Sequence, residues 1–321
     1  MSSPVSLASL HRVSLILMRL RRTGLASAAT LVALLAVVAA GCGSKSSESA
    51  SSTSTTASPT KCGPGQLNLL ARGGDQLTIG TDNPAYDPWF SGGTPKGSSW
   101  KYNDPTTQKG YESAVAYAIA KQLGFTPAQV KWVVVPFEQL FKPGPKSYDF
   151  DVNEVSVTAA RKKVVTFSDS YYNTNQALVA IKGTPITKAK TLADLKKYKL
   201  GAQVGTTSYD YIVKNIKPDK QPAVYNNSND VNSGLKTGGI DGIVVDLPTA
   251  FIIVGAEEVP NSVVVGSFPA KGGGDHFGAV FAKGNSLVDC VNQALATLKS
   301  NGTLKQLQNK WISNAGAPVL K

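Results

Sequence analysis

Three polar side chains with the chemistry of a recognition site stand close together in the stretch "NEVSVTAARKKVVTFSDSYY" (153–172). Ser156 and Thr158 offer hydroxyls, and Arg161 offers paired, planar donors that match a carboxylate better than a lysine does. The segment before them has the apolar residues of a buried strand. Polar groups in this place indicate ligand binding rather than packing, and a small zwitterion is the ligand that they suit.

Further polar groups follow other expected strands. Asp82 ends "QLTIGTD", Thr206 and Thr207 lie between a strand and the next helix, and Asp246 ends "DGIVVD". Ligands of open α/β sheets bind beyond the carboxyl ends of the strands. Asp246 suits an ammonium group, Ser156 adds a polar contact, and free N–H groups at a helix start attract a carboxylate.

Each of these residues also has an ordinary explanation. Arg161 taken alone fits a surface arginine, Asp246 a helix N-cap, and the two threonines plain capping. Their joint placement after successive strands favours one shared binding site over these separate roles.

The elements that must position these groups alternate along the chain, with strand patterns followed by helix patterns. Such alternation predicts an α/β fold with mostly parallel sheets. Residues 111–125 have the spacing of a helix, with Gly124 at the position of a left-handed C-terminal cap. A later helix is expected to begin at 303 with a capping box from Thr303 to Gln306.

The N-terminus has the pattern of an export signal. Four arginines precede the apolar run "LASAATLVALLAVVAA", which ends in "AAGC" and is shorter than a membrane span. We therefore predict a lipoprotein signal peptide over 1–41 and lipidation of Cys42, although Ala39 occupies a position where Leu is usual. An ordinary secretory signal, an uncleaved anchor and twin-arginine export at Arg21-Arg22 remain alternatives. The Ser/Thr-rich residues 42–65 predict a flexible, lipidated tether.

Composition narrows the function classes. Without its first 41 residues the chain keeps 280 of 321, and loss of the four leader arginines lowers its formal charge from +12 to +8. The lysines are scattered, so a nucleic-acid partner is not expected. The sequence has only two histidines, His11 and His276, and no CxxC motif. A metal site therefore has little support, and no cofactor is expected.

Two cysteines remain in the body of the expected exported chain, Cys62 and Cys290. Thiols outside the cytoplasm tend to pair, so we predict a disulfide that joins the start of the fold to a late helix. Two buried, unreactive thiols are the alternative.

Six segments together resemble the extracytoplasmic polar amino-acid-binding proteins of ABC importers, known as solute-binding protein family 3. The resemblance spans 77–312, and its most specific element is the block around "SVTAAR" and "TFSDSYY". The segments are "LTIGTDNPAYDPWF", "GYESAVAYAIAKQLG", "VSVTAARKKVVTFSDSYY", "LADLKKYKLGAQVGTT", "GGIDGIVVD" and "ALATLKSNGTLKQLQNKW".

The resemblance implies a two-lobed periplasmic-binding-protein-like (type II) fold whose lobes are joined by two crossing strands. It places lobe 1 over 66–175 and 276–321, and lobe 2 over 176–275, with Gly272 to Gly274 in a crossing strand or hinge. It also implies that Arg161 grips the ligand carboxylate with help from the backbone at Ser156 and Thr207. By the same resemblance, Asp246 holds the ammonium and Asp82 lines the lobe 1 side. Tyr86 is expected to form an aromatic wall together with either Trp89 or Phe137.

The chain departs from the family pattern in three places. Asp151 and Glu154 replace apolar or small residues, the loop from Trp89 to Gly110 is long, and "FKPGPKSYD" interrupts an expected helix. Glu154 is expected either to pair with Arg161, which we favour slightly, or to contact the ligand's side chain. The acidic residues at 82, 151, 154 and 246 favour a basic or polar ligand.

The resulting hypothesis is a monomeric lipoprotein on the outer face of the cell membrane. It captures an amino acid by hinged closure of its lobes and delivers it to an ABC permease. An exported enzyme on the same fold, similar to cyclohexadienyl dehydratase, is the alternative, and Glu154 is its candidate acid or base.

Overall fold

The computed structural model describes residues 62–70, 74–269, 274–312 and 317–321. The expected signal peptide, Cys42 and the tether as far as Lys61 lie outside the described residues, as do Gly272 and Gly273 of the expected hinge. None of the helices within the described ranges is long and apolar enough to cross a bilayer.

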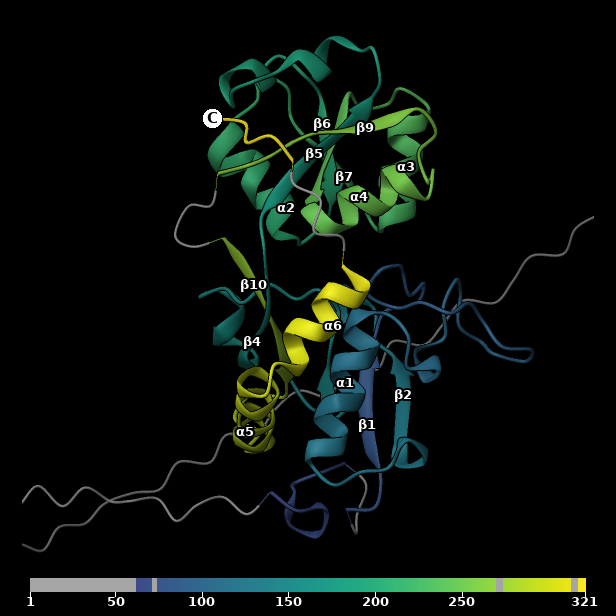
Figure 1. Cartoon of the computed structure of the whole chain (residues 1–321). Coiled ribbons are helices and arrows are strands. Elements are labelled where there is room, and N and C mark those ends of the chain that lie inside the picture. Colours follow the sequence, from purple (N-terminus) through teal and green to yellow (C-terminus); the bar gives the residue numbers. More distant parts are fainter. Residues whose placement is uncertain (1–61, 71–73, 270–273, 313–316) are drawn as a thin grey trace, which may run out of the picture. The chain divides into compact units, whose positions relative to one another are not determined.

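Lobe 1 is built on a five-stranded sheet in the order β2-β1-β3-β10-β4 (Figure 1). β1 pairs in parallel with β2 and β3, whereas β10 runs antiparallel to β3 and β4. Every residue of β1 is buried, as expected of a central strand covered on both faces. The strands are β1 Leu77–Thr81, β2 Val130–Val134, β3 Phe150–Asp151, β4 Thr166–Thr174 and β10 Asp275–Phe281.

Lobe 2 repeats this plan with the order β7-β6-β8-β5-β9. β6 pairs in parallel with β7 and β8, and β5 runs antiparallel to β8 and β9. Two mixed sheets with flanking helices confirm the predicted α/β, two-lobed architecture. The strands are β5 Gln176–Ile181, β6 Leu200–Gln203, β7 Ala223–Tyr225, β8 Gly242–Asp246 and β9 Ser262–Ser267.

The α-helices pack their apolar residues on these sheets. Val115 and Ile119 of α1 and Leu295 of α5 share one buried core with Ile79 of β1, and the core of lobe 2 includes Leu235 of α3. Figure 1 shows α1, α5 and α6 on lobe 1, and α2, α3 and α4 on lobe 2. Their bounds are α1 Tyr111–Gln122, α2 Thr207–Tyr211, α3 Ser228–Lys236, α4 Leu247–Gly255, α5 Leu287–Ser300 and α6 Thr303–Trp311.

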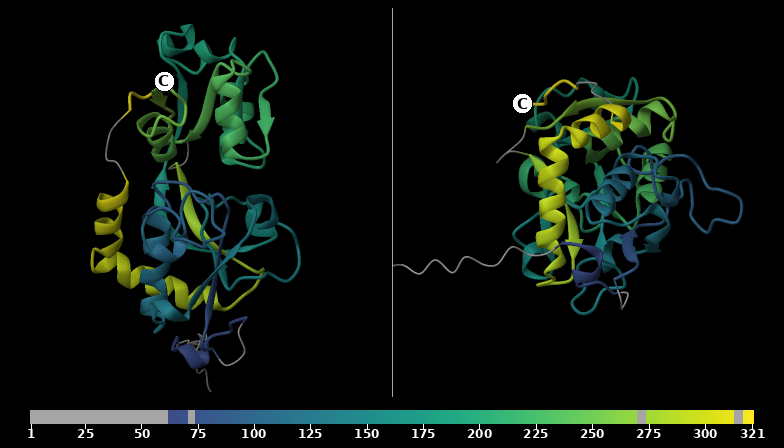
Figure 2. Two further views of the ribbon diagram at one scale, coloured as in Figure 1. Left: turned by 90° about the vertical axis from the view of Figure 1, so that its right-hand side faces the viewer. Right: turned by 60° about the horizontal axis from the view of Figure 1, so that its bottom comes forward.

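The chain crosses between the lobes where β4 leads into β5 and where β9 leads to β10. The C-terminus differs from the expected boundary, because Val319 bridges Ser267 of β9 and Leu320 is buried in the core of lobe 2. Figure 2 shows this end of the chain beside lobe 2. The last described residues, 317–321, therefore belong to lobe 2, where the burial of one leucine and main-chain pairing hold them.

Local structure differs from expectation at two further points. The predicted strand before Ser156 ends early, at Asp151, because Glu154 adopts a left-handed conformation with φ of 50°. The predicted capping box is wrong, since Gly302 is the N-cap of α6 and Thr303 is already its first helical residue. Gly124, in contrast, has the predicted left-handed conformation, with φ of 88°.

A disulfide joins Cys62 to Cys290 of α5, with a Cα–Cα distance of 5.4 Å. Asp149 joins Leu70 to β1. Its carboxylate accepts hydrogen bonds from the N–H groups of Leu70 at 2.7 Å and of Thr78 in β1 at 2.6 Å. The first described residues are thus fastened to lobe 1.

Candidate functional site

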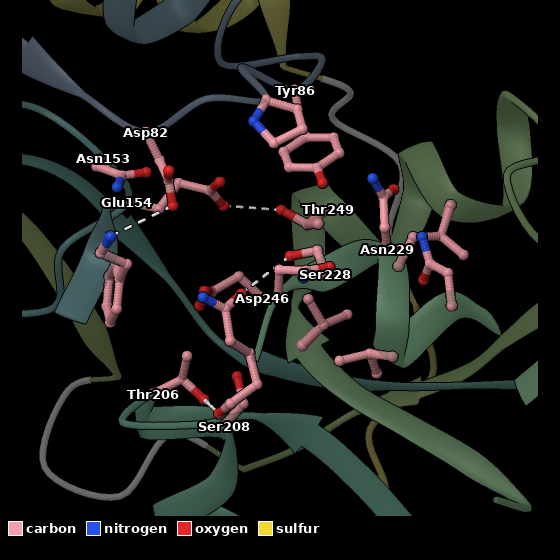
Figure 3. A pocket seen from close by; sticks show the side chains of 18 of the residues that line it. Asp82, Tyr86, Asn153, Glu154, Thr206, Ser208, Ser228, Asn229, Asp246 and Thr249 are labelled. Carbon is pink, nitrogen blue, oxygen red and sulfur yellow. Dashed lines mark hydrogen bonds between the residues drawn. The ribbon is translucent and has the colours of Figure 1, made fainter. Parts of the chain in front are cut away.

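A cavity of about 620 Å³ lies between the lobes, and residues from both lobes line it (Figure 3). This volume is typical of clefts that enclose small molecules. All nine residues expected to bind ligand lie in its wall: Asp82, Tyr86, Phe137, Glu154, Ser156, Arg161, Thr206, Thr207 and Asp246. The structure therefore brings together groups that are up to 164 positions apart in the sequence.

Arg161 lies at the hinge side of the cavity and connects the lobes. Its guanidinium donates to the backbone carbonyls of Ser156 at 2.6 Å and of Gly205 at 2.8 Å, the latter in lobe 2. It also lies 4.7 Å from the ring centroid of Phe141. Burial lowers the pKa of Arg161 to about 10, so it keeps its charge at neutral pH, and Asp275 and Asp246 oppose the shift.

Asp246 is positioned by the end of β8 and the start of α4. It occupies the N-cap position of α4, yet its side chain makes no capping hydrogen bond. Its carboxylate instead accepts a hydrogen bond from the Gln176 amide at 2.8 Å. Burial, reinforced by Asp275, raises the pKa of Asp246 well above its usual value, and Arg161 partly offsets this. A positive charge placed beside Asp246 in the cavity would favour its ionised form.

Sequence reasoning missed two polar residues of the crossing segments. Asp275, at the start of β10, accepts hydrogen bonds from the Thr207 hydroxyl at 2.7 Å and the Gln176 amide at 2.8 Å. Gln176 in turn accepts one from the Ser208 hydroxyl at 2.6 Å. These bonds tie the crossing segments to the start of α2. The signal in the sequence was a polar residue next to each expected lobe boundary: Gln176 just after 175 and Asp275 just before 276.

Thr206 and Thr207 have different roles. The Thr206 hydroxyl caps α2 by accepting the N–H of Tyr209 at 3.2 Å. Thr207 points its hydroxyl toward the hinge, where it lies 3.3 Å from the Ser156 hydroxyl of lobe 1. Thr158, from the same motif as Ser156 and Arg161, is not in the cavity wall. Its hydroxyl accepts the N–H of Arg161 at 3.1 Å.

Glu154 contacts lobe 2 and not Arg161. Its carboxylate accepts a hydrogen bond from the Thr249 hydroxyl of α4 at 2.8 Å (Figure 3), and no ion pair joins it to Arg161 in the described structure. The expected pairing is therefore wrong, because the left-handed turn at Glu154 directs its side chain across the cleft. Burial raises the pKa of Glu154 well above its usual value, and Glu112 and Asp246 add to the shift.

Trp89 supports this contact from beneath the cavity surface. Its indole N–H donates to the Thr249 hydroxyl at 3.1 Å, and its side chain is only 1% exposed. Of the two aromatic alternatives beside Tyr86, Phe137 lines the cavity and Trp89 does not. Trp89 is packed against Tyr172 and Phe277 in the core of lobe 1.

The remaining expected residues lie in the lobe 1 wall. The Asp82 carboxylate accepts N–H groups from Asn83 at 2.7 Å and Phe137 at 3.3 Å, and burial raises its pKa. Tyr86 lies 5.5 Å from Tyr102, measured between ring centroids, and Tyr102 accepts a hydrogen bond from Asn229 of lobe 2 at 3.2 Å. The long loop after Trp89 thus supplies a further contact between the lobes.

Comparison with known proteins identifies the family. Residues 93–314 match the model of the bacterial extracellular solute-binding proteins, family 3. The chain belongs to this family. The resemblance recognised from its sequence motifs is thereby confirmed.

Relatives of the chain bind amino acids. It is 30% identical over 211 residues to the L-arginine-binding protein of Pseudomonas aeruginosa, covering 64% of this chain and 79% of that protein. An ancestral arginine-binding protein solved with arginine is 30% identical, with a TM-score of 0.61 over 74% of this chain and 99% of its own. The ancestral amino acid-binding protein AncCDT-1, a precursor of cyclohexadienyl dehydratase, is 27% identical, with a TM-score of 0.59 over 74% and 95%.

Proposed function

We propose that this solute-binding protein captures an amino acid between its lobes and delivers it to an ABC import permease. The observation that carries the proposal is the placement of Arg161 and Asp246 in the wall of one cavity, Arg161 from lobe 1 and Asp246 from lobe 2. A guanidinium from one lobe and a carboxylate from the other complement the carboxylate and ammonium of an amino acid. Lipidation of Cys42 and the tether that follows it, as far as Lys61, would hold the protein at the outer face of the membrane as a monomer.

The charge of the wall favours a polar or basic ligand. Its acidic residues outnumber its basic residues, Lys101 and Arg161. A ligand with a net positive charge would neutralise part of this excess, whereas an acidic ligand would add to it. The acidic residues are Asp82, Asp87, Glu154, Asp230, Asp246 and Glu258.

Closure of the lobes supplies the mechanism. Three contacts exist only when the lobes meet. They join Arg161 to Gly205, Thr249 to Glu154 and Asn229 to Tyr102. A ligand bound by both lobes favours the closed state, and a change from mostly open to mostly closed takes about 5.5 kcal/mol of differential binding. An ion pair at each end of the amino acid is the interaction expected to provide it.

A thermal-shift screen against the proteinogenic amino acids and cystine tests the proposal. A ligand at one hundred times its Kd stabilises the folded state by about 2.7 kcal/mol, which raises the melting temperature measurably. We expect polar or basic amino acids to produce the largest shifts. Failure of every compound to shift the melting temperature, confirmed by titration calorimetry, would rule the proposal out.

One observation favours enzymatic activity as a second candidate. Glu154 is an acid with a raised pKa in the cavity wall, as a general acid requires, and AncCDT-1 preceded a dehydratase. Incubation with cyclic carboxylic acids that carry a leaving hydroxyl distinguishes the two functions. Recovery of these acids unchanged supports binding alone, whereas loss of water that is abolished by Glu154→Gln supports the enzyme.

A further inference from the structure

The cavity has two ends. The Arg161 guanidinium donates to the carbonyl of Gly205, the residue before Thr206. Figure 3 shows Thr206 and Tyr86 on opposite sides of the cavity, so the Tyr86 end is separate from the end where Arg161 would hold a ligand carboxylate. The Tyr86 end is the one that the ligand's side chain would reach. The carboxylates that act on the Tyr86 hydroxyl are Glu258, Asp82 and Asp230.

Glu258 belongs to lobe 2 and reaches this end from a turn just after α4. Asn232 of α3, which is only 5% exposed, donates its amide N–H to one Glu258 oxygen at 3.0 Å. The carboxylate is thereby oriented within the cavity wall. Asp82 lines the same cavity from lobe 1, so acids of both lobes face the space beside Tyr86.

The Tyr86 hydroxyl points into this space, as Figure 3 shows. It is buried and has no hydrogen-bond partner among the described residues. A buried polar group of this kind carries a cost unless a ligand or water satisfies it. Its acidic surroundings favour a ligand group that brings positive charge and N–H donors.

We propose that Glu258 is a specificity-determining residue which, with Asp82 and Tyr86, encloses a cationic end of the ligand's side chain. The inference rests on the proposed function and adds the substrate class: amino acids with a positively charged side-chain terminus. Since Asp82 and Glu258 belong to different lobes, the full set of partners for the cation forms only in the closed state. Recognition of side-chain charge is thus coupled to closure.

Arginine and citrulline are the probes that test this role, because they have nearly the same shape and differ in charge. Calorimetric titrations compare the wild type with Glu258→Gln, which keeps an oxygen for the Asn232 amide. Loss of one charge-assisted hydrogen bond lowers affinity by roughly 10- to 100-fold. We expect a loss of this size for arginine and a change of less than about threefold for citrulline.

Glu257→Gln is the matched control, because Glu257 is adjacent, exposed and absent from the cavity wall. It is expected to leave both affinities unchanged. Glu258→Asp keeps the charge but withdraws it by one methylene, and should lie between the wild type and Glu258→Gln. Melting temperatures of all variants show whether they are folded.

The outcomes separate this inference from the proposed function. If the wild type binds amino acids but Glu258→Gln leaves the ratio of arginine to citrulline affinity unchanged, the role of Glu258 is overturned and the proposed function stands. Equal losses for both probes also overturn it. If the wild type binds no amino acid at all, the proposed function fails, and the inference fails with it.

Discussion

The carboxylate of Glu112 accepts the backbone N–H of Glu154 at 2.7 Å, and this bond fixes the turn that points Glu154 across the cleft. Glu112 lies in the first turn of α1, is fully buried and also accepts a hydrogen bond from the Tyr171 hydroxyl. Glu154 adopts a left-handed conformation, which a residue with a side chain rarely does without support. A buried acid behind the cavity therefore shapes its wall.

Glu112 should make stability depend on pH. Burial raises its pKa from 4.5 to about 7. Between these values the folded state retains a proton that the unfolded state has released, so the free energy of unfolding falls as pH rises. The loss is complete above pH 7 and amounts to about 3 kcal/mol, at 1.36 kcal/mol for each pKa unit.

Urea denaturation between pH 4 and 8 measures this effect as the difference between the wild type and Glu112→Gln. The difference isolates Glu112, because other buried acids such as Asp151 have pKa values raised in the same direction. Asp169→Asn, at an exposed position, is the control and should reproduce the wild-type profile. Parallel profiles for the wild type and Glu112→Gln would contradict the assignment.

Arg161→Ala should abolish most ligand affinity. Removal of the guanidinium leaves a ligand carboxylate buried without its partner, which costs about 2–5 kcal/mol. Arg161→Lys keeps the charge but cannot donate two parallel hydrogen bonds, so it should recover only part of the loss. Calorimetry with the amino acid identified in the thermal-shift screen measures both variants. Affinity close to wild type in Arg161→Ala would remove Arg161 from the site.

Much of the framework could be predicted because it follows from local patterns. Alternation of apolar residues marks β1, helical spacing marks α1, and a glycine after a helix marks its left-handed cap, as at Gly124. The nine expected site residues line one cavity because the carboxyl ends of parallel strands meet at one edge of each sheet, and the two lobes face this cavity from either side.

The parts that escaped prediction depend on contacts between distant segments. A polar residue in a crossing segment, such as Gln176 or Asp275, has no periodicity to distinguish it from a loop residue. Glu112 looks like any acid that favours the start of a helix. The direction of the Glu154 side chain depends on its left-handed backbone, which Glu112 holds from 42 residues away.

The disulfide should contribute to stability without affecting binding. Cys62 and Cys290 are 228 positions apart, so their bond removes much of the freedom of the unfolded chain, worth up to about 5 kcal/mol in the chain-entropy model. The double variant Cys62→Ser/Cys290→Ser should therefore denature at lower urea concentration. Its ligand affinity should match the wild type, since neither cysteine lines the cavity. A matching denaturation midpoint would show that the bond does not stabilise the fold.

Thr249 should control how readily the lobes close. Its hydroxyl donates to Glu154 and accepts from Trp89, so it connects α4 of lobe 2 to two groups of lobe 1. Thr249→Val keeps the shape of the side chain but leaves both partners unsatisfied when the lobes meet, whereas water reaches them when the lobes separate. A buried group without its partner costs about 1–3 kcal/mol, so the affinity should fall by roughly 5- to 150-fold.

Calorimetry gives the affinity of Thr249→Val, and small-angle X-ray scattering gives its radius of gyration with and without ligand. Thr249→Ser retains the hydroxyl and should behave as the wild type in both measurements. A Thr249→Val variant that binds as tightly as Thr249→Ser would show that the contact makes no difference to closure. A weaker affinity with an unchanged melting temperature in the absence of ligand would place the effect in the closed state, because only that state brings Thr249 to Glu154.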